Sequence, residues 1–132
     1  MEFESTEKLA MVYETLKNIE TAITRLQERT VQIHSADDFV LSPFGMEKLD
    51  AACMVIIALG ESVKTLDKLT NKELLPTYPS LDWKKVMGAR DIMAHHYFMI
   101  DAEEVFSIVK NDLEPLKKAI VFFKEQLFCN NK

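Results

Sequence analysis

The middle of the chain carries a long helical pattern whose centre, residues 51–60 with the sequence AACMVIIALG, contains no charged residue. The whole pattern runs from about Phe44 to Leu69 and predicts one helix. A helix that is apolar on all sides requires burial on all sides. In a domain this small, one flank can face the core, while the other stays in water unless another chain covers it. The pattern therefore predicts a homodimer, with the central helix of a monomeric bundle as the alternative.

The N-terminal third of the chain predicts a second long helix. Apolar residues recur at three- and four-residue steps from about Ser5 to Glu28, which is the spacing of an amphipathic helix. Residues 34–43 are rich in Asp and Ser and break this spacing, so they are expected to form a connection with one short turn near residues 38–41.

The second half of the chain is expected to hold shorter helices. Thr70 is predicted to cap a short helix that runs through Leu75, and a further helix is predicted to begin at residues 80–82 and to continue through residue 97. Asp101, followed by Glu104, has the pattern of a helix start. Pro115 either kinks that last helix or separates it from residues 116–128.

These patterns, with only three glycines and four prolines in 132 residues, predict one all-α domain over residues 1–132, an up-down bundle of four to five main helices. The N-terminus lacks the features of a signal peptide, so a cytoplasmic location is expected. No apolar run is long enough to cross a bilayer, so no membrane partner is expected. Cys53 and Cys129 have no metal-ligand spacing, and neither a zinc site nor another cofactor is predicted.

The charge of the chain limits how it can contact nucleic acid. The net charge is −5 and the pI is about 5.2, whereas general nucleic-acid-coating proteins usually present a basic face. Any RNA contact is therefore expected to be local. Lys84 and Lys85 precede the candidate site, and Lys64 and Lys68 lie on the central helix; they either guide RNA or are ordinary solvated lysines.

Residues 88–101, GARDIMAHHYFMID, combine groups suited to RNA chemistry. Arg90 offers a fork of donors that matches phosphate oxygens, His95 can move protons near neutral pH, and Tyr97 can stack on a base. On an ideal helix, Arg90 and His95 differ by about 140° in rotation and by roughly 7.5 Å along the axis. One helix is therefore a poor complete site, and two copies meeting across a twofold axis would assemble a better one.

Other readings of the same residues remain open. Arg90 could pair with Asp91 or Glu61, and the two histidines could be ordinary helix residues. Asp91, His95 and His96 have side chains that ligate metals, although adjacent histidines diverge on a helix. Glu61 either lies near the dimer cleft, in contact with Arg90 or a histidine, or is an ordinary helix carboxylate.

Arg90, His95 and Tyr97 stand at the positions of the RX4HXY motif, and the segment resembles that motif in HepT-like proteins of the HEPN superfamily. The resemblance covers roughly residues 44–120. It includes LGE at residues 59–61, LLPTYPSLDWKKVMGARD at residues 74–91 and YFMIDAEEVFSIVKNDLEPLKKAI at residues 97–120. Two positions depart from the commonest pattern: Asp91 replaces a frequent asparagine, and His96 replaces an acidic or polar residue. Asp91 would either weaken phosphate binding by Arg90 or orient His95.

The resemblance implies a metal-independent endoribonuclease toxin that acts as a helical homodimer and is neutralised by a minimal nucleotidyltransferase antitoxin. It implies that Arg90 stabilises the scissile phosphate and that His95 acts as general acid or base while the ribose 2′-hydroxyl attacks. It also implies that the antitoxin transfers AMP from ATP to Tyr97. Apart from the resemblance, Asp91, His96 and Glu61 are expected to be supporting residues of the site. The alternative is a HEPN protein without nuclease activity that serves as a partner or substrate-binding subunit of a nucleotidyltransferase.

Overall fold

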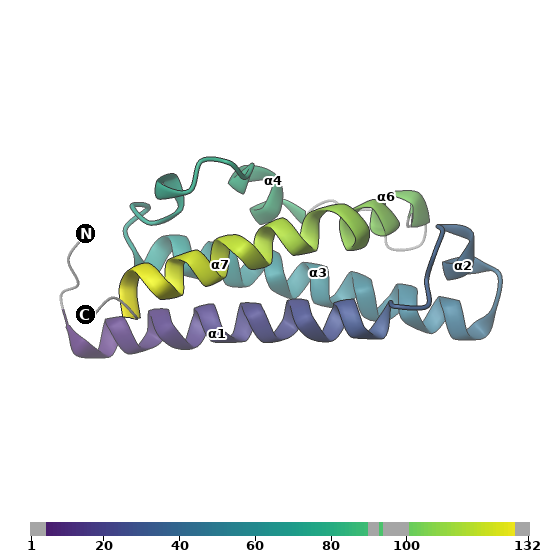
Figure 1. The fold of residues 1–132 in the computed structure, drawn as a ribbon, viewed down its shortest axis with the longest axis horizontal. Coiled ribbons are helices and arrows are strands. Elements are labelled where there is room, and N and C mark those ends of the chain that lie inside the picture. Colours follow the sequence, from purple (N-terminus) through teal and green to yellow (C-terminus); the bar gives the residue numbers. More distant parts are fainter. Residues whose placement is uncertain (1–4, 90–92, 94–100, 129–132) are drawn as a thin grey trace.

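The computed structural model describes residues 5–89, 93 and 101–128, and every regular element in these ranges is helical. Figure 1 shows three long helices lying along the long axis of the molecule: α1(Thr6–Arg29), α3(Pro43–Leu69) and α7(Leu113–Phe128). The shorter elements are α2(Asp37–Val40), the 3₁₀ turn η1(Leu75–Thr77), α4(Trp83–Met87), α6(Ala102–Ser107) and the π-helical turn η3(Ile108–Asp112). The described part of the chain thus confirms the predicted all-α helical bundle.

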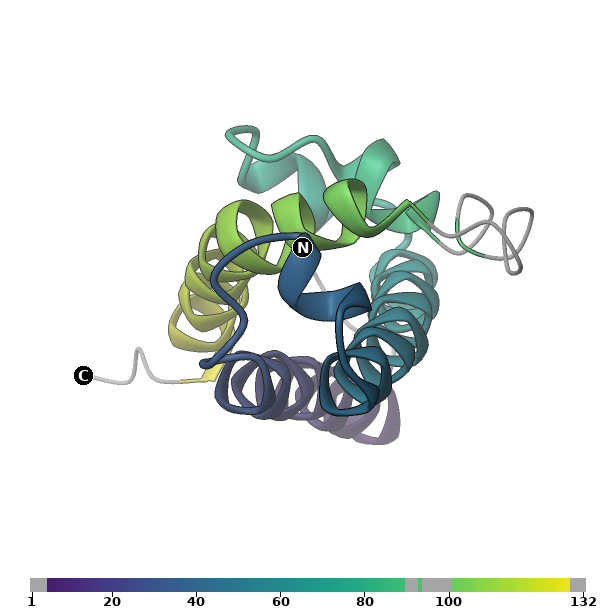
Figure 2. The same ribbon diagram turned by 90° about the vertical axis from the view of Figure 1, so that its right-hand side faces the viewer.

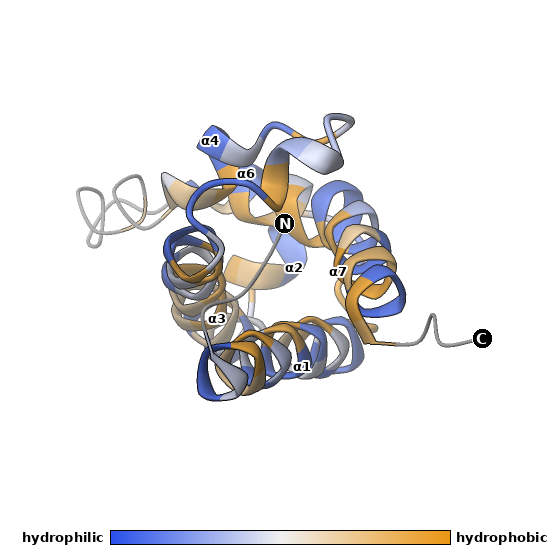
Figure 3. Ribbon diagram, turned by 90° about the vertical axis from the view of Figure 1, so that its left-hand side faces the viewer, coloured by the Kyte–Doolittle hydropathy of each residue, from blue (hydrophilic) through white to orange (hydrophobic). Residues whose placement is uncertain are grey.

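The core lies between the three long helices. On α1, the fully or almost fully buried side chains recur at three- and four-residue steps: Val12, Leu16, Ile19, Ile23 and Leu26. They pack toward α3 and α7, and Figure 3 shows the hydrophobic sides of α1 and α7 turned toward the interior. Figure 2 shows α2 lying across one end of the bundle, where Phe39 is completely buried. Apolar burial at helical spacing therefore accounts for the arrangement.

Side-chain caps fix the starts of the main helices. Ser5 and Ser42 accept hydrogen bonds from the backbone N–H groups of Lys8 and Gly45, each at 3.0 Å, at the starts of α1 and α3. Asp82 does the same for α4 and Asp101 for α6. These groups satisfy amides that have no partner within the helix. The predicted starts of all four helices are confirmed within a few residues.

The prediction that Thr70 begins a short helix is wrong, because Thr70 ends α3. Its hydroxyl donates back to the Leu66 carbonyl at 2.9 Å instead of accepting from a later amide. Asn71 and Lys72 both have positive φ, 55° and 62°, and their amides donate to the carbonyls of Lys68 and Asp67. This is a Schellman ending, and two left-handed residues cannot continue a right-handed helix.

Pro115 does not separate two helices, since α6, η3 and α7 follow one another without a break. A proline within a helix lacks the amide that would bond to the carbonyl four residues earlier, and its ring crowds that carbonyl. Here the wider π turn ends just before Leu113, whose amide donates to the Ile108 carbonyl. The π turn therefore makes room for the proline ring at the start of α7.

No helix in the described ranges is long and apolar enough to cross a membrane.

Candidate functional site

Most of the predicted site residues fall outside the part of the chain that the structure describes. These are Arg90, Asp91, His95, His96 and Tyr97. The predicted helix through this segment can therefore be followed only at Ala89 and Met93, which are both helical. Glu61 and the four lysines are described, and so are the elements that lead into and out of the segment.

The helix that leads into the segment, α4, is anchored at its first residue. Trp83 is only 9% exposed, and its indole Nε1–H donates to the Tyr78 carbonyl at 2.9 Å. Its ring stacks on Phe123 of α7, with the ring centroids 5.8 Å apart and the planes at 29°. A buried aromatic ring with its polar atom hydrogen-bonded is a firm anchor. The start of α4 is thus fixed to the body of the bundle.

The other end of α4 packs closely on α3 at Gly60. A Cβ atom placed on Gly60 would lie 3.0 Å from the Val86 carbonyl oxygen and 3.8 Å from the Ala89 Cβ. The backbones of the two helices therefore meet where α3 has no side chain. This contact lies directly before Arg90 in the sequence.

Met93 and Asp101, the described residues on either side of residues 94–100, are both fixed in the bundle. Met93 is 4% exposed and belongs to the core cluster, and Ala89 packs against the same cluster one helical turn earlier. Asp101 accepts hydrogen bonds from the Glu103 and Glu104 amides at 2.9 and 3.4 Å and starts α6, which packs on α3. The described elements before and after the candidate residues, α4 and α6, therefore both pack on α3.

Glu61 follows Gly60 on α3 and lies next to the end of α4. Its side chain is 48% exposed, and its carboxylate lies 3.6 Å from Lys64 Nζ. An exposed pair at this helical spacing contributes only a few tenths of a kcal/mol, ~0.3–0.5. The predicted position of Glu61 near a dimer cleft and its predicted contacts with Arg90 or a histidine stay predictions, because they involve a second chain or residues outside the described ranges.

The lysines near the segment present a weaker positive surface than their number suggests. Lys84, Lys85, Lys64 and Lys68 are all exposed, but carboxylates lie beside two of them. Lys64 pairs with Glu61, and Lys85 Nζ lies 4.0 Å from Asp112 Oδ2. An adjacent negative charge cancels much of the field of a lysine beyond a few ångströms. The contribution of these lysines to RNA attraction is correspondingly reduced.

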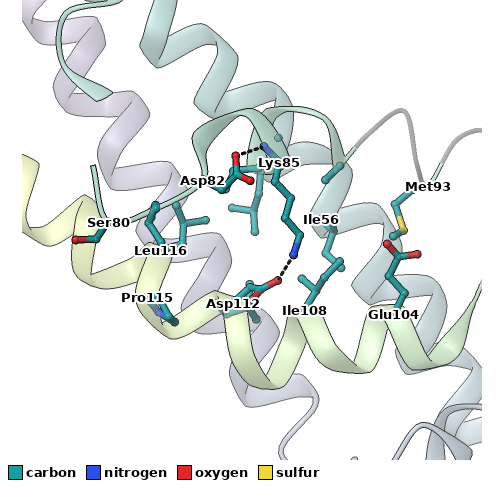
Figure 4. A pocket seen from close by; sticks show the side chains of 16 residues that line it. Ile56, Ser80, Asp82, Lys85, Met93, Glu104, Ile108, Asp112, Pro115 and Leu116 are labelled. Carbon is teal, nitrogen blue, oxygen red and sulfur yellow. Dashed lines mark hydrogen bonds and ion pairs between the residues drawn. The ribbon is translucent and has the colours of Figure 1, made fainter. Parts of the chain in front are cut away.

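A cavity of about 350 Å³ lies beside the same segment, between α3, α4 and the α6–η3–α7 helix. Figure 4 shows Lys85 reaching along this cavity toward Asp112, with Ile56 and Ile108 to one side of it and Met93 near Glu104 farther along that side. Its walls are mostly apolar, and Ala89 and Met93 form part of them. In the described residues no group of three His, Cys, Asp or Glu could hold a metal. The cavity thus lies beside Ala89 and Met93, and its charged lining residues are Asp82, Lys85, Glu104 and Asp112.

Gly60 and the Trp83 anchor were not singled out from the sequence. Gly60 appeared there only as the last residue of the charge-free stretch 51–60 and as part of the LGE resemblance. The sequence does contain a signal for the role of Gly60. A glycine inside a long helix is less favourable than alanine by about 1 kcal/mol, so its presence suggests that another backbone approaches closely there. Which backbone approaches cannot be read from one sequence.

The family profile described as "Ribonuclease HepT-like" matches residues 19–122 of the chain. In Methanocaldococcus jannaschii, a protein named "Gamma-glutamylcyclotransferase and putative RNase MJ0434" is 31% identical over 87% of this chain and 48% of its own length. In the same organism, "Putative RNase MJ1380" is 35% identical over 49% of this chain and 60% of its own length. There too, "Putative RNase MJ0127" is 28% identical over 84% of this chain and 85% of its own length.

The chain thus spans about half of the first of these relatives and less than two thirds of the second. No solved structure is significantly similar to it. The family match covers most of the chain and includes the whole segment from Arg90 to Tyr97 together with the helices that anchor it. The chain belongs to the HepT-like ribonuclease family of the HEPN superfamily.

Proposed function

We propose that this protein is a metal-independent endoribonuclease toxin, formed by a single HEPN domain over residues 1–132 that acts as a homodimer. The observation that carries the proposal is the family match over residues 19–122, which includes an intact Arg90, His95 and Tyr97 motif. Several relatives carry the words "putative RNase" in their names. The close packing of α4 on α3 at Gly60 and the burial of Met93 support the proposal, because these described residues lie beside Arg90 in the sequence and a catalytic site needs a rigid framework.

The proposed reaction is attack of the ribose 2′-oxygen on the adjacent phosphorus. The bond from phosphorus to the 5′-oxygen of the next nucleotide breaks, which leaves a 2′,3′-cyclic phosphate and a 5′-hydroxyl. His95 acts as general acid or base, either by taking the proton from the 2′-hydroxyl or by giving one to the departing 5′-oxygen. Arg90 stabilises the charge that develops on the phosphoryl oxygens. No metal ion is required for either step. Asp91, His96 and Glu61 are proposed to orient these groups or to tune their charge.

The homodimer is proposed to use the outer flank of α3, defined here as Met54, Val55, Ile57 and Ala58. Met54 is 68% exposed, Ala58 is exposed, and Val55 and Ile57 are half-buried. The opposite side of the same helix is in the core, with Ala52, Cys53, Ile56 and Leu59 buried. An apolar flank left open in one chain is the kind of surface that a second copy covers. Two copies would bring two Arg90 and two His95 side chains toward a shared cleft.

Regulation is proposed to act on Tyr97. A cognate minimal nucleotidyltransferase would transfer AMP from ATP to the phenol oxygen and release pyrophosphate. The adduct would place a bulky anion beside Arg90, where it would block the cleft and repel RNA phosphates. With a purified cognate enzyme and ATP, an AMP adduct should appear by mass spectrometry on the wild type and be absent from Tyr97→Phe; an unchanged adduct on that variant would place the target elsewhere.

The nuclease proposal is tested by inducing the wild type, Arg90→Ala and His95→Ala, and by following growth together with the integrity of total RNA and tRNA in the same cultures. Growth inhibition with RNA cleavage only in the wild type is the expected result. Circular dichroism and sedimentation of the purified variants should show an unchanged fold and assembly. Unchanged toxicity in either folded variant would remove the proposed mechanism.

The second candidate function is a HEPN partner of a nucleotidyltransferase that does not cut RNA. Two observations favour it: the chain carries a net charge of −5, and carboxylates lie beside Lys64 and Lys85 near the candidate segment. Both weaken attraction for RNA. If the wild-type protein is folded, carries no AMP on Tyr97 and still does not cleave RNA, that result would favour this second function.

A further inference from the structure

Gly60 lies within α3, where its backbone is that of an ordinary helix. The described residues contain no glycine with positive φ, so Gly60 is not needed for an unusual backbone angle. It is buried, and α3 continues through it to Leu69. The glycine must therefore matter because it has no side chain, which leaves room for a neighbouring group.

That space is closed by the backbone of α4. A Cβ atom on residue 60 would lie 3.0 Å from the Val86 carbonyl oxygen and 3.7 Å from the Met87 carbonyl oxygen. The first distance is shorter than an ordinary contact between carbon and oxygen, so the carbonyl would have to move by a few tenths of an ångström. A flexible side chain could move away at little cost, but a helical carbonyl moves only with its helix.

The start of α4 cannot follow such a movement freely. Trp83 is held by its hydrogen bond to the Tyr78 carbonyl and by its stack on Phe123. Within α4, the Val86 amide bonds to the Asp82 carbonyl at 3.2 Å, and the Gly88 amide bonds to the Lys84 carbonyl at 2.9 Å. A push at Val86 would therefore tilt the far end of α4 about a fixed start. That far end leads directly into Ala89 and Arg90.

We infer that Gly60 is a positioning residue for the proposed site: its missing side chain sets how closely the end of α4, which leads into Arg90 in the sequence, approaches α3. This inference rests on the proposed ribonuclease function. If Arg90 stabilises charge that develops in the transition state, a displaced arginine lowers kcat more than it changes KM. A misplacement of about 1 Å costs roughly 100-fold in rate, so a shift of a few tenths of an ångström is expected to cost on the order of tenfold.

The test is Gly60→Ala, which adds only the methyl group whose contacts are described above. Alanine favours helix more than glycine does, which offsets the strain of the new contact, so the variant is expected to fold with a melting temperature close to that of the wild type. RNA cleavage by the wild type, Gly60→Ala and Arg90→Ala is measured over a range of RNA concentrations. The expected result is a roughly tenfold lower kcat for Gly60→Ala with KM changed less than about threefold.

Val12→Ala is the matched control for a loss of packing, because Val12 is completely buried. It lies in the first half of α1, and no residue of α1 lines the cavity beside α4. It should lower the melting temperature by several degrees, ~5 °C, and keep the kcat of the folded protein. A direct readout of position comes from the methyl resonances of Ala89 and Met93, which should shift in Gly60→Ala and stay in place in Val12→Ala.

Three results would overturn the inference while leaving the nuclease proposal standing. They are a wild-type kcat in Gly60→Ala, a Gly60→Ala protein that fails to fold, and an equal loss of kcat in folded Val12→Ala. A Gly60→Ala protein that fails to fold would show that the contact is required by the fold itself. Absence of cleavage by the wild type would instead remove both proposals, so the two failures are distinguishable.

Discussion

Replacing Trp83 with phenylalanine should destabilise the bundle because it removes one hydrogen bond and part of a buried ring. The indole Nε1–H donates to the Tyr78 carbonyl at 2.9 Å, and a hydrogen bond of this kind contributes about 1 kcal/mol. The side chain is only 9% exposed, so the smaller ring leaves a void that costs a further 1–2 kcal/mol or so. The stack on Phe123 can largely remain. The expected loss in the free energy of unfolding is therefore about 2–3 kcal/mol.

Urea unfolding followed by far-ultraviolet circular dichroism measures this loss, at one fixed protein concentration because association affects the apparent stability. In a chain of 132 residues the melting temperature should fall by roughly 10 °C. Tyr13→Phe is the matched control: Tyr13 is 36% exposed and makes an edge contact with Phe128, so its loss of stability should stay below about 0.5 kcal/mol. A loss below about 0.5 kcal/mol for Trp83→Phe as well would refute the anchoring of α4 by Trp83.

Three further predictions test other parts of the molecule. Burial, together with the nearby Asp50 carboxylate, raises the pKa of the Cys53 thiol from 9.0 to about 11. The thiol therefore keeps its proton to a higher pH in the folded protein than in the unfolded chain. The stability that this difference contributes is complete below pH 9 and is lost as the pH rises toward 11. Urea titrations between these pH values should show a steeper decline for the wild type than for Cys53→Ala, and parallel declines would contradict the assignment. Asp101→Ala should lower the free energy of unfolding by about 1 kcal/mol through loss of the α6 cap, whereas the neighbouring Glu103→Ala should change it by less than half as much, and equal effects would argue against the cap. Met54→Asp should raise the dimer dissociation constant by on the order of tenfold or more in sedimentation experiments, whereas Met11→Asp, at a methionine that is 53% exposed on α1, should leave it unchanged; the proposed interface fails if both variants behave alike.

The positions of the long helices could be predicted because their signals are local. Apolar spacing marked α1 and α3, and Ser42 followed by Pro43 marks a helix start in almost any context. Asp82 and Asp101 likewise cap the helices that follow them. Each of these signals depends on neighbouring residues and on backbone chemistry that a single sequence already contains.

The ending at Thr70 and the passage through Pro115 depended on more than local sequence. A threonine can stand at either end of a helix, and the left-handed Asn71 and Lys72 decided that Thr70 ends α3. The π turn before Pro115 keeps one helix packed along the bundle where proline alone suggested a kink or a break. Packing against other elements selects between such alternatives, and one-dimensional patterns do not contain it.

The candidate chemistry was predicted from residue types and from family resemblance, and the family is confirmed. The roles of Arg90, His95 and Tyr97 stay predictions, since these residues lie outside the described ranges. The framework around them could not be predicted, because it depends on contacts between distant parts of the sequence. The approach of Val86 to Gly60 and the stack of Trp83 on Phe123 are two such contacts.

The most direct test of the proposed activity is cleavage of purified RNA by the purified protein in the presence of a chelator, with the new RNA ends identified by mass spectrometry. The protein is first shown by mass to carry no AMP on Tyr97, and Arg90→Ala serves as the control for contaminating nucleases. The proposed mechanism predicts cleavage by the wild type alone, with 2′,3′-cyclic phosphate and 5′-hydroxyl ends. No cleavage by the folded wild type, or cleavage that needs a divalent metal and leaves 3′-hydroxyl ends, would contradict it.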